Sequence, residues 1–244
     1  MTGECGKHIE QRLLAMCNDN EARHLARFFK TGVGEYGEGD KFIGVRVPVT
    51  RLLVREYRHE GDIADVKRLI SSEWHEVRLA GLLLLVEIYQ RAVKSGDDTM
   101  AKQTVEFYLN NLDRGNNWDL VDVIAPKILG NRLLRCPEER DVLYRLAEMD
   151  GYLWHQRVAI VSTWTLIRDG EYNDTIAISE RYITHRHDLI HKATGWMLRE
   201  VGKRGGIFEL CEFLECHAAE MPRTMLRYAI EQLPADKRKY YMLK

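Results

Sequence analysis

Apolar residues recur along most of the chain at intervals of three and four, the spacing that places them on one side of an α-helix. This pattern predicts an all-α protein with short connections between its helices. We expect helices over residues 7–17, 20–30, 48–57, 63–71, 74–94, 98–113, 117–130, 138–149, 152–168, 173–184, 188–204, 206–219 and 221–232. No run of alternating polar and apolar residues predicts a β-strand.

Four segments with a similar pattern recur at a constant spacing of 35 residues. They are "DVIAPKIL" from residue 122, "RVAIVSTW" from 157, "KATGWMLR" from 192 and "RYAIEQLP" from 227, and a relative, "RLAGLLLL" from 78, precedes them by a longer interval. Two helices per unit at such a period are typical of a superhelical HEAT-like solenoid, in which stacked hairpins supply one another's core. Since no linker rich in Pro, Gly or Ser interrupts the chain, we expect a single domain over residues 1–244 with a concave face.

The first position of these segments carries charge. It is occupied by Arg78, Asp122, Arg157, Lys192 and Arg227. Equivalent positions line up in space in a solenoid. The four cations therefore predict a positive ridge, interrupted by one carboxylate.

Trp118 and Asp122 lie one helical turn apart, roughly 40° from each other around the helix axis. They flank the apolar stripe instead of lying inside it, and Asn116 or Asn117 can cap the helix start. Lys192 is equivalent to Asp122 in the repeat register, and Trp196 follows it by four residues. The repeat therefore places a second indole one helical turn beyond the position equivalent to Asp122, two repeats later. A tryptophan at a helix edge can also serve packing alone, and an acid near a helix start can serve the helix dipole, which explains Asp119 well.

Composition and charge narrow the function. The net charge is −1, so a nucleic-acid partner must be met by a local basic face and not by a basic protein as a whole. The 5 cysteines are odd in number and scattered, which indicates reduced thiols. The N-terminal residues contain no continuous apolar stretch, so we expect no signal peptide, and the longest apolar run, at 79–89, is too short to span a bilayer. We therefore expect a cytoplasmic protein without a membrane partner.

Two short motifs point to other chemistry, but their context argues against it. Residues 32–37 spell a formal G-x-G-x-x-G, yet a helix precedes it where a dinucleotide fold requires a strand, so we interpret 31–47 as a flexible surface loop. His187 and His191 are spaced as zinc ligands, but the run "HDLIH" lacks the glutamate of a metalloprotease. We expect neither a metal nor a cofactor.

The segments "NNWDLVDVIAPKILG" and "HKATGWMLREVGKRG" resemble the AlkD family of DNA alkylation-repair glycosylases. The resemblance continues through "FIGVRVPVTRLLVREY", "WHEVRLAGLLLL" and "WHQRVAIVSTWTLI". It implies HEAT-like repeats that grip duplex DNA and remove N3- and N7-alkylated purines without a deep base pocket. It also implies that Asp122 is the catalytic carboxylate, that Trp118 and Trp196 are aromatic walls, and that Arg157 lies near the lesion. The same resemblance places Arg199, Lys203 and Arg204 against the DNA backbone.

These residue types suit that reaction. An alkylated purine is already cationic, so it can leave without a general acid, and one carboxylate can stabilise the oxocarbenium-like sugar. Tryptophan faces attract cations. We therefore expect a monofunctional glycosylase that acts on double-stranded DNA as a monomer and associates with the nucleoid. Two alternatives remain open, a non-catalytic binder of DNA or RNA and a protein–protein scaffold built from helical repeats.

Overall fold

The computed structural model describes residues 3–244, and these form an all-α structure, as the sequence predicted. No β-strand occurs among them; Lys41 and Trp74 form an isolated bridge. The chain divides into two compact units, residues 1–120 and 121–244, and the boundary falls within helix α7 (Trp118–Ile124). The single domain expected over residues 1–244 stays a prediction.

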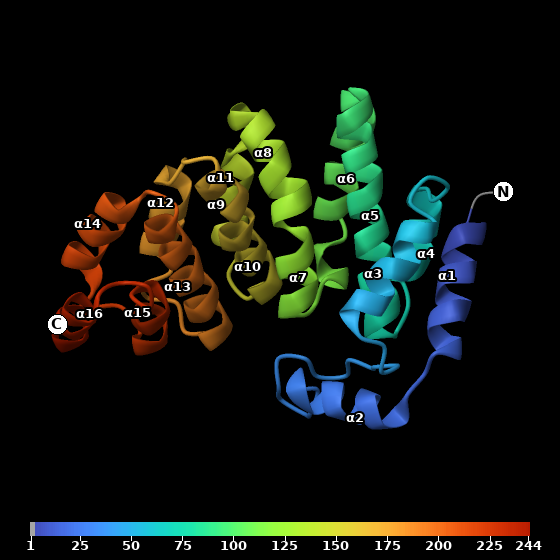
Figure 1. Cartoon of the computed structure of the whole chain (residues 1–244), viewed down its shortest axis with the longest axis horizontal. Coiled ribbons are helices and arrows are strands. Elements are labelled where there is room, and N and C mark those ends of the chain that lie inside the picture. The colour runs from blue at the N-terminus through green and yellow to red at the C-terminus, as the bar shows by residue number, and fades with distance from the viewer. Residues whose placement is uncertain (1–2) are drawn as a thin grey trace. The chain divides into compact units, whose positions relative to one another are not determined.

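The first unit is organised around one long buried helix. Its elements are α1 (Glu4–Ala15), α2 (Asp19–Phe28), α3 (Val47–Glu56), α4 (Ile63–Ile70), α5 (His75–Ser95), α6 (Asp98–Leu109) and the short 3₁₀-helix η1 (Leu112–Arg114). Helix α5 packs against α1, α3, α4 and α6 (Figure 1). It is apolar on most of its circumference, the property of a helix covered on all sides. At Gly81 a Cβ atom would lie 2.8 Å from the Cβ atom of Leu69, so glycine permits the close approach of α4.

The described part of the second unit contains no helix as long as α5. After α7, its elements are the π-helical η2 (Pro126–Gly130), α8 (Asn131–Arg135), the 3₁₀-helix η3 (Pro137–Glu139), α9 (Asp141–Ala147), α10 (Leu153–Ser162), α11 (Trp164–Arg168), α12 (Asn173–Arg181), α13 (Asp188–Lys203), α14 (Ile207–His217), α15 (Arg223–Ala229) and α16 (Ala235–Leu243). Helix α13 packs against α10, α14 and α15. The hydrophobic pattern did not predict α8 and α16 as separate helices.

The 35-residue period of the sequence reappears in the helix starts. Helices α7, α10, α13 and α15 begin at Trp118, Leu153, Asp188 and Arg223, each 35 residues after the one before. Within the second unit, α10 contacts α13 and α13 contacts α15. Gly195 allows α13 to approach α15 closely, because a Cβ there would lie 2.4 Å from the carbonyl oxygen of Met225. These features agree with the helical-repeat fold.

The helix expected over 117–130 is wrong in its length. Helix α7 ends at Ile124 and is followed by one π-helical turn, closed by a 3.0 Å bond from the Gly130 N–H to the Ala125 carbonyl. Pro126 has no N–H to continue the α-helical pattern. Gly130 also lies so close to α10 that a Cβ atom would come within 2.3 Å of the Ser162 carbonyl. The helix expected over 152–168 is likewise divided, at Thr163.

The glycine-rich stretch lies at the surface over residues 32–35, 38 and 39, as expected, and its flexibility stays a prediction. Its glycines are bonded locally, because the Glu35 carboxylate accepts from the Gly32 N–H at 2.9 Å. Its end is buried, since Asp40 is only 9% exposed. Beyond it, the carboxylate of Glu76 accepts from the backbone N–H groups of residues 43–45 at 2.8–3.2 Å. Helix α5 therefore anchors the end of this segment, at residues 43–45.

Candidate active site

Asp122 of α7 and Arg157 of α10 form a bidentate ion pair. The Arg157 Nε donates to Asp122 Oδ1 at 2.8 Å, and Nη2 donates to Oδ2 at 2.7 Å. The third guanidinium nitrogen donates to the Leu189 carbonyl at the start of α13, at 2.6 Å. The side chain of Asp122 is only 16% exposed, and that of Arg157 is 6% exposed. The arginine fork thus fixes both carboxylate oxygens and supplies the balancing charge.

Trp118 is the first residue of α7, one helical turn before Asp122. Its backbone N–H donates to the side-chain oxygen of Asn117 at 2.9 Å. This bond reaches only the first residue of the helix, so the expected cap on the following turn stays a prediction. Its half-buried ring lies 5.3 Å from the ring of Phe29 and 5.9 Å from that of Phe28. The side chains of Trp118 and Asp122 leave the helix on the same side because they are four residues apart.

Trp196 lies in α13 of the second unit and is half-buried. Its neighbours Gly195 and Met197 are buried, so the indole lies at the edge of the core. The convergence of Trp118, Asp122 and Trp196 on one site stays a prediction.

Two of the four cations predicted to form a positive ridge are buried. Arg157 is 5% exposed, with its guanidinium bonded to Asp122 and Leu189. Arg78 is also 5% exposed, and its guanidinium bonds Asp40 at 2.6 Å and the carbonyls of residues 72 and 73. A burial of this degree requires a charged group to be paired. Neither arginine therefore forms part of an exposed ridge, contrary to the sequence prediction.

The remaining predicted DNA contacts lie nearer to the solvent. Lys192 pairs with Asp188 one turn earlier at 2.7 Å, and Arg199 pairs with Glu231. Arg204 lies over the ring of Trp164, 5.2 Å from its centroid. Lys203, Arg204 and Arg227 are exposed. Their contacts with DNA stay predictions, and their exposure leaves that role open to them.

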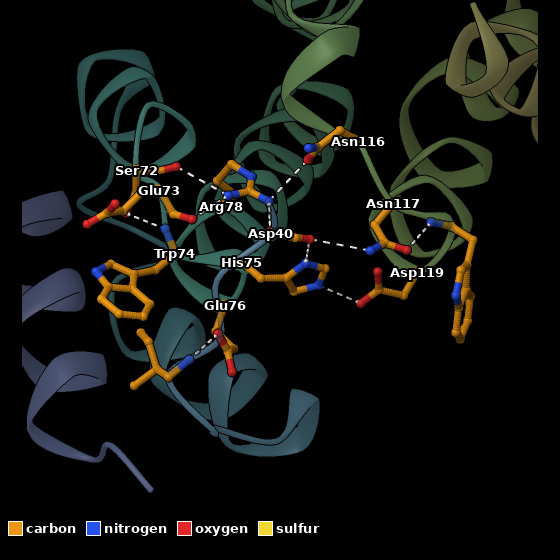
Figure 2. A network of polar contacts seen from close by, with 12 residues as sticks. Asp40, Ser72, Glu73, Trp74, His75, Glu76, Arg78, Asn116, Asn117 and Asp119 are labelled. Carbon is orange, nitrogen blue, oxygen red and sulfur yellow. Dashed lines mark hydrogen bonds and ion pairs between the residues drawn. The ribbon is translucent and has the colours of Figure 1, made fainter. Parts of the chain in front are cut away.

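A buried polar network that sequence reasoning missed lies in the first unit, at the start of α7 (Figure 2). The His75 ring nitrogens bond two carboxylates: Nδ1 bonds Asp40 at 2.7 Å, and Nε2 bonds Asp119 at 2.9 Å. Asp40 also accepts from Arg78 and, at 3.3 Å, from the amide of Asn117. Asp119 thus has a specific partner besides the helix dipole. The available sequence signal was His75 and Arg78 within the apolar run of α5, because buried charges in such a run require partners.

The two carboxylates keep His75 charged. Burial lowers the pKa of His75, but hydrogen bonds to Asp119 and Asp40 outweigh it and raise the pKa from 6.5 to about 9. Burial would likewise raise the pKa of Asp40, but the contacts with His75 and Arg78 lower it overall. Charges of both signs therefore alternate within this buried network, as buried ionic groups require.

We expect the protein to lose stability with rising pH because the folded state holds the His75 proton more tightly than the unfolded chain does. The contribution is complete below pH 6.5 and is lost as the pH rises through about 9. A shift of this size corresponds to about 3 kcal/mol of unfolding free energy. The urea midpoint should decrease between about pH 6 and about pH 10, and the decrease should be larger for the wild type than for His75→Gln. Equal falls in the two proteins would contradict this expectation.

Other features of the second unit offer little support for a cofactor. Cys136, Glu138 and Glu139 place potential metal ligands within 4.8 Å of one another, but Glu139 already accepts from Arg132 at 2.9 and 2.5 Å. His187 caps α13 by accepting from the Leu189 N–H at 3.1 Å. The absence of a metal from the reaction stays a prediction. No helix within residues 3–244 has the length and apolar character needed to cross a membrane.

Comparison with known proteins identifies the family. Residues 9–233 match the family model described as DNA alkylation repair enzyme. A solved structure from Enterococcus faecalis, described as a predicted DNA alkylation repair enzyme, is similar to this chain with a TM-score of 0.68 and 17% sequence identity. The match covers 90% of this chain and 97% of that one, and at this identity it shows a shared fold. No curated protein sequence matches significantly. The family match spans nearly the whole chain, and the protein therefore belongs to the DNA alkylation repair enzyme family.

Proposed function

We propose that this protein is a monofunctional DNA glycosylase that releases cationic N3- and N7-alkylated purines from duplex DNA. Its family membership supports a role in alkylation repair. The observation that carries the more specific proposal is the Asp122 carboxylate, which Arg157 holds by both oxygens one helical turn from Trp118. Such a fixed carboxylate is the group that hydrolysis of an already cationic nucleoside requires.

The proposed reaction uses Asp122 and no general acid. An N3- or N7-alkylated purine carries a positive charge and leaves as a neutral base, so its departure requires no proton. As the glycosidic bond lengthens, positive charge develops on the sugar. The Asp122 carboxylate would stabilise that charge and orient the attacking water, whose proton it can accept. Arg157 would act by holding the carboxylate in place.

The two tryptophans would supply selectivity for charge. An indole face attracts a cation by about 0.5–2 kcal/mol. We propose that Trp118 and Trp196 favour the alkylated base or the cationic sugar over a neutral nucleoside. Phe28 and Phe29 pack against Trp118 and limit the rotation of its ring.

We propose double-stranded DNA as the partner and the nucleoid of the cytoplasm as the place of action, with the protein acting as a monomer. Cations of the second unit would contact backbone phosphates: the half-buried Lys192 and Arg199 and the exposed Lys203, Arg204 and Arg227. Such contacts position the duplex without reading its sequence. They also make affinity fall with rising salt.

Incubation with methylated duplex DNA tests the proposal. We expect free 7-methylguanine and 3-methyladenine in the supernatant, abasic sites in the DNA and no strand cleavage, because a monofunctional enzyme only hydrolyses the glycosidic bond. Binding that weakens with salt but releases no base would indicate a non-catalytic nucleic-acid binder instead. The absence of both binding and release would indicate a protein scaffold.

A further inference from the structure

His75 lies where three segments of the first unit meet: the end of the glycine-rich loop, the start of α5 and the first turn of α7. Its two ring nitrogens bond Asp40 and Asp119 at 2.7 and 2.9 Å. Ionised carboxylates only accept hydrogen bonds, so both ring nitrogens must carry a proton. The imidazolium is 2% exposed and therefore lies away from the solvent.

The same network fixes the residues on both sides of Trp118. Arg78 donates to the side-chain oxygen of Asn116 at 3.1 Å and to Asp40 at 2.6 Å. The Asn117 amide donates to Asp40 at 3.3 Å, and its oxygen accepts the Trp118 N–H at 2.9 Å. Figure 2 shows these bonds running from Arg78 through Asp40 to Asn117. Asn116 and Asp119 are thus bonded to α5 directly, and Asn117 is bonded to it through Asp40.

The ring of Trp118 is held from a second direction. Phe29 lies 5.3 Å from the indole, 5.2 Å from the ring of Phe42 and 5.2 Å from His75. Phe42 in turn stacks on His75 at 4.5 Å. The His75 ring therefore supports the Trp118 backbone through its hydrogen bonds and the Trp118 ring through the aromatic stack.

The network also has a local structural consequence, beyond its contribution to the pH dependence of stability. Helix α7 has only seven residues, too few to form without support from its surroundings. A site that acts by positioning requires its groups to be held by surrounding bonds.

We infer that His75 is a positioning residue for the proposed glycosylase: by bridging Asp40 and Asp119 it fixes the first turn of α7 and, with it, the indole of Trp118. This inference rests on the proposed function. The charged groups that face His75 are Asp40 from the loop, Asp119 from α7 and, through Asp40, Arg78 from its own helix.

The test compares four proteins: the wild type, His75→Gln, the double variant His75→Gln with Asp119→Asn, and the control Leu84→Ala. Leu84 is buried in α5 outside the network, so its truncation lowers stability by leaving a cavity. Single-turnover release of 7-methylguanine and the Kd for duplex DNA are measured well below each Tm. Hydrogen exchange of residues 116–121 is followed in parallel.

We expect His75→Gln to release base about 100-fold more slowly, the scale of a small misplacement of a reacting group. The duplex Kd should change little, and exchange should accelerate at 116–121. The double variant should regain much of the rate, because the glutamine amide can donate to Asp40 and accept from the introduced asparagine amide. Leu84→Ala should retain its rate despite a lower Tm.

Several results would overturn the inference. These are a wild-type rate in His75→Gln, an equal loss in Leu84→Ala, or no rescue in the double variant. If His75→Gln does not fold, Asp119→Asn takes its place and should show a smaller loss in the same direction. If the wild type releases no base, the proposed function fails, and hydrogen exchange alone then decides whether His75 fixes the Trp118 segment.

Discussion

Replacement of Asp122 by asparagine should slow base release from methylated duplex DNA by about 100- to 1,000-fold, the loss typical for removal of one electrostatic group aimed at a transition state. Asparagine keeps the shape of the side chain and can still accept from Arg157, but it has no negative charge to stabilise the cationic sugar. Single-turnover kinetics at saturating enzyme measure the chemical step separately from DNA binding.

Asp174→Asn is a matched control for this substitution. Asp174 belongs to the same unit, is 8% exposed and accepts from the Tyr144 hydroxyl at 2.7 Å. It also accepts from Arg140 at 3.3 Å, so the same chemical change removes a buried carboxylate from an arginine. We expect this variant to lose stability and retain its rate. Full activity of Asp122→Asn would remove Asp122 from the mechanism.

Replacement of Arg157 by alanine should lower the unfolding free energy by about 3–5 kcal/mol, the cost of leaving one partner of a buried ion pair uncompensated. Asp122 would lose its two charge-assisted bonds with Arg157, and the Leu189 carbonyl would lose a donor. Base release should fall as well, because the carboxylate would no longer be oriented. Urea unfolding of the purified variant measures the loss of stability.

Two further variants serve as controls, one for the burial of the ion pair and one for its geometry. Arg181→Ala removes an exposed arginine that pairs with Glu148 in the same unit and should change the unfolding free energy by no more than about 1 kcal/mol. Arg157→Lys keeps the positive charge but cannot form the two parallel bonds of the guanidinium. We expect it to lie between the wild type and Arg157→Ala in both stability and rate. An Arg157→Ala variant as stable as Arg181→Ala would show that the pair contributes little.

The repeat pattern placed Asp122 and Arg157 at equivalent positions, but it did not predict the bond between them. Asp122 and Arg157 are 35 residues apart, at equivalent positions of neighbouring repeats, and they form an ion pair. The same pattern could not show that Arg157 is buried, since a buried paired arginine and an exposed one look alike in a hydrophobic profile. The prediction of a positive ridge failed at Arg78 for the same reason.

The network around His75 could not be predicted from local patterns. Its members are separated by 35 residues between Asp40 and His75 and by 44 between His75 and Asp119, and no repeat relates them. The helix break after Ile124 did have a sequence signal, in Pro126 and Gly130. The close packing of Gly130 against Ser162 had no such signal, because it depends on the tertiary structure.

The central claim is that one carboxylate suffices because the leaving group is already charged. The most direct test uses two duplexes of identical sequence, one with cationic 7-methylguanine and one with neutral hypoxanthine at the same position. Released bases are quantified by mass spectrometry under single-turnover conditions. We expect release of 7-methylguanine and none of hypoxanthine above the uncatalysed background. Equal release from both duplexes, or no release from the cationic one, would contradict the claim.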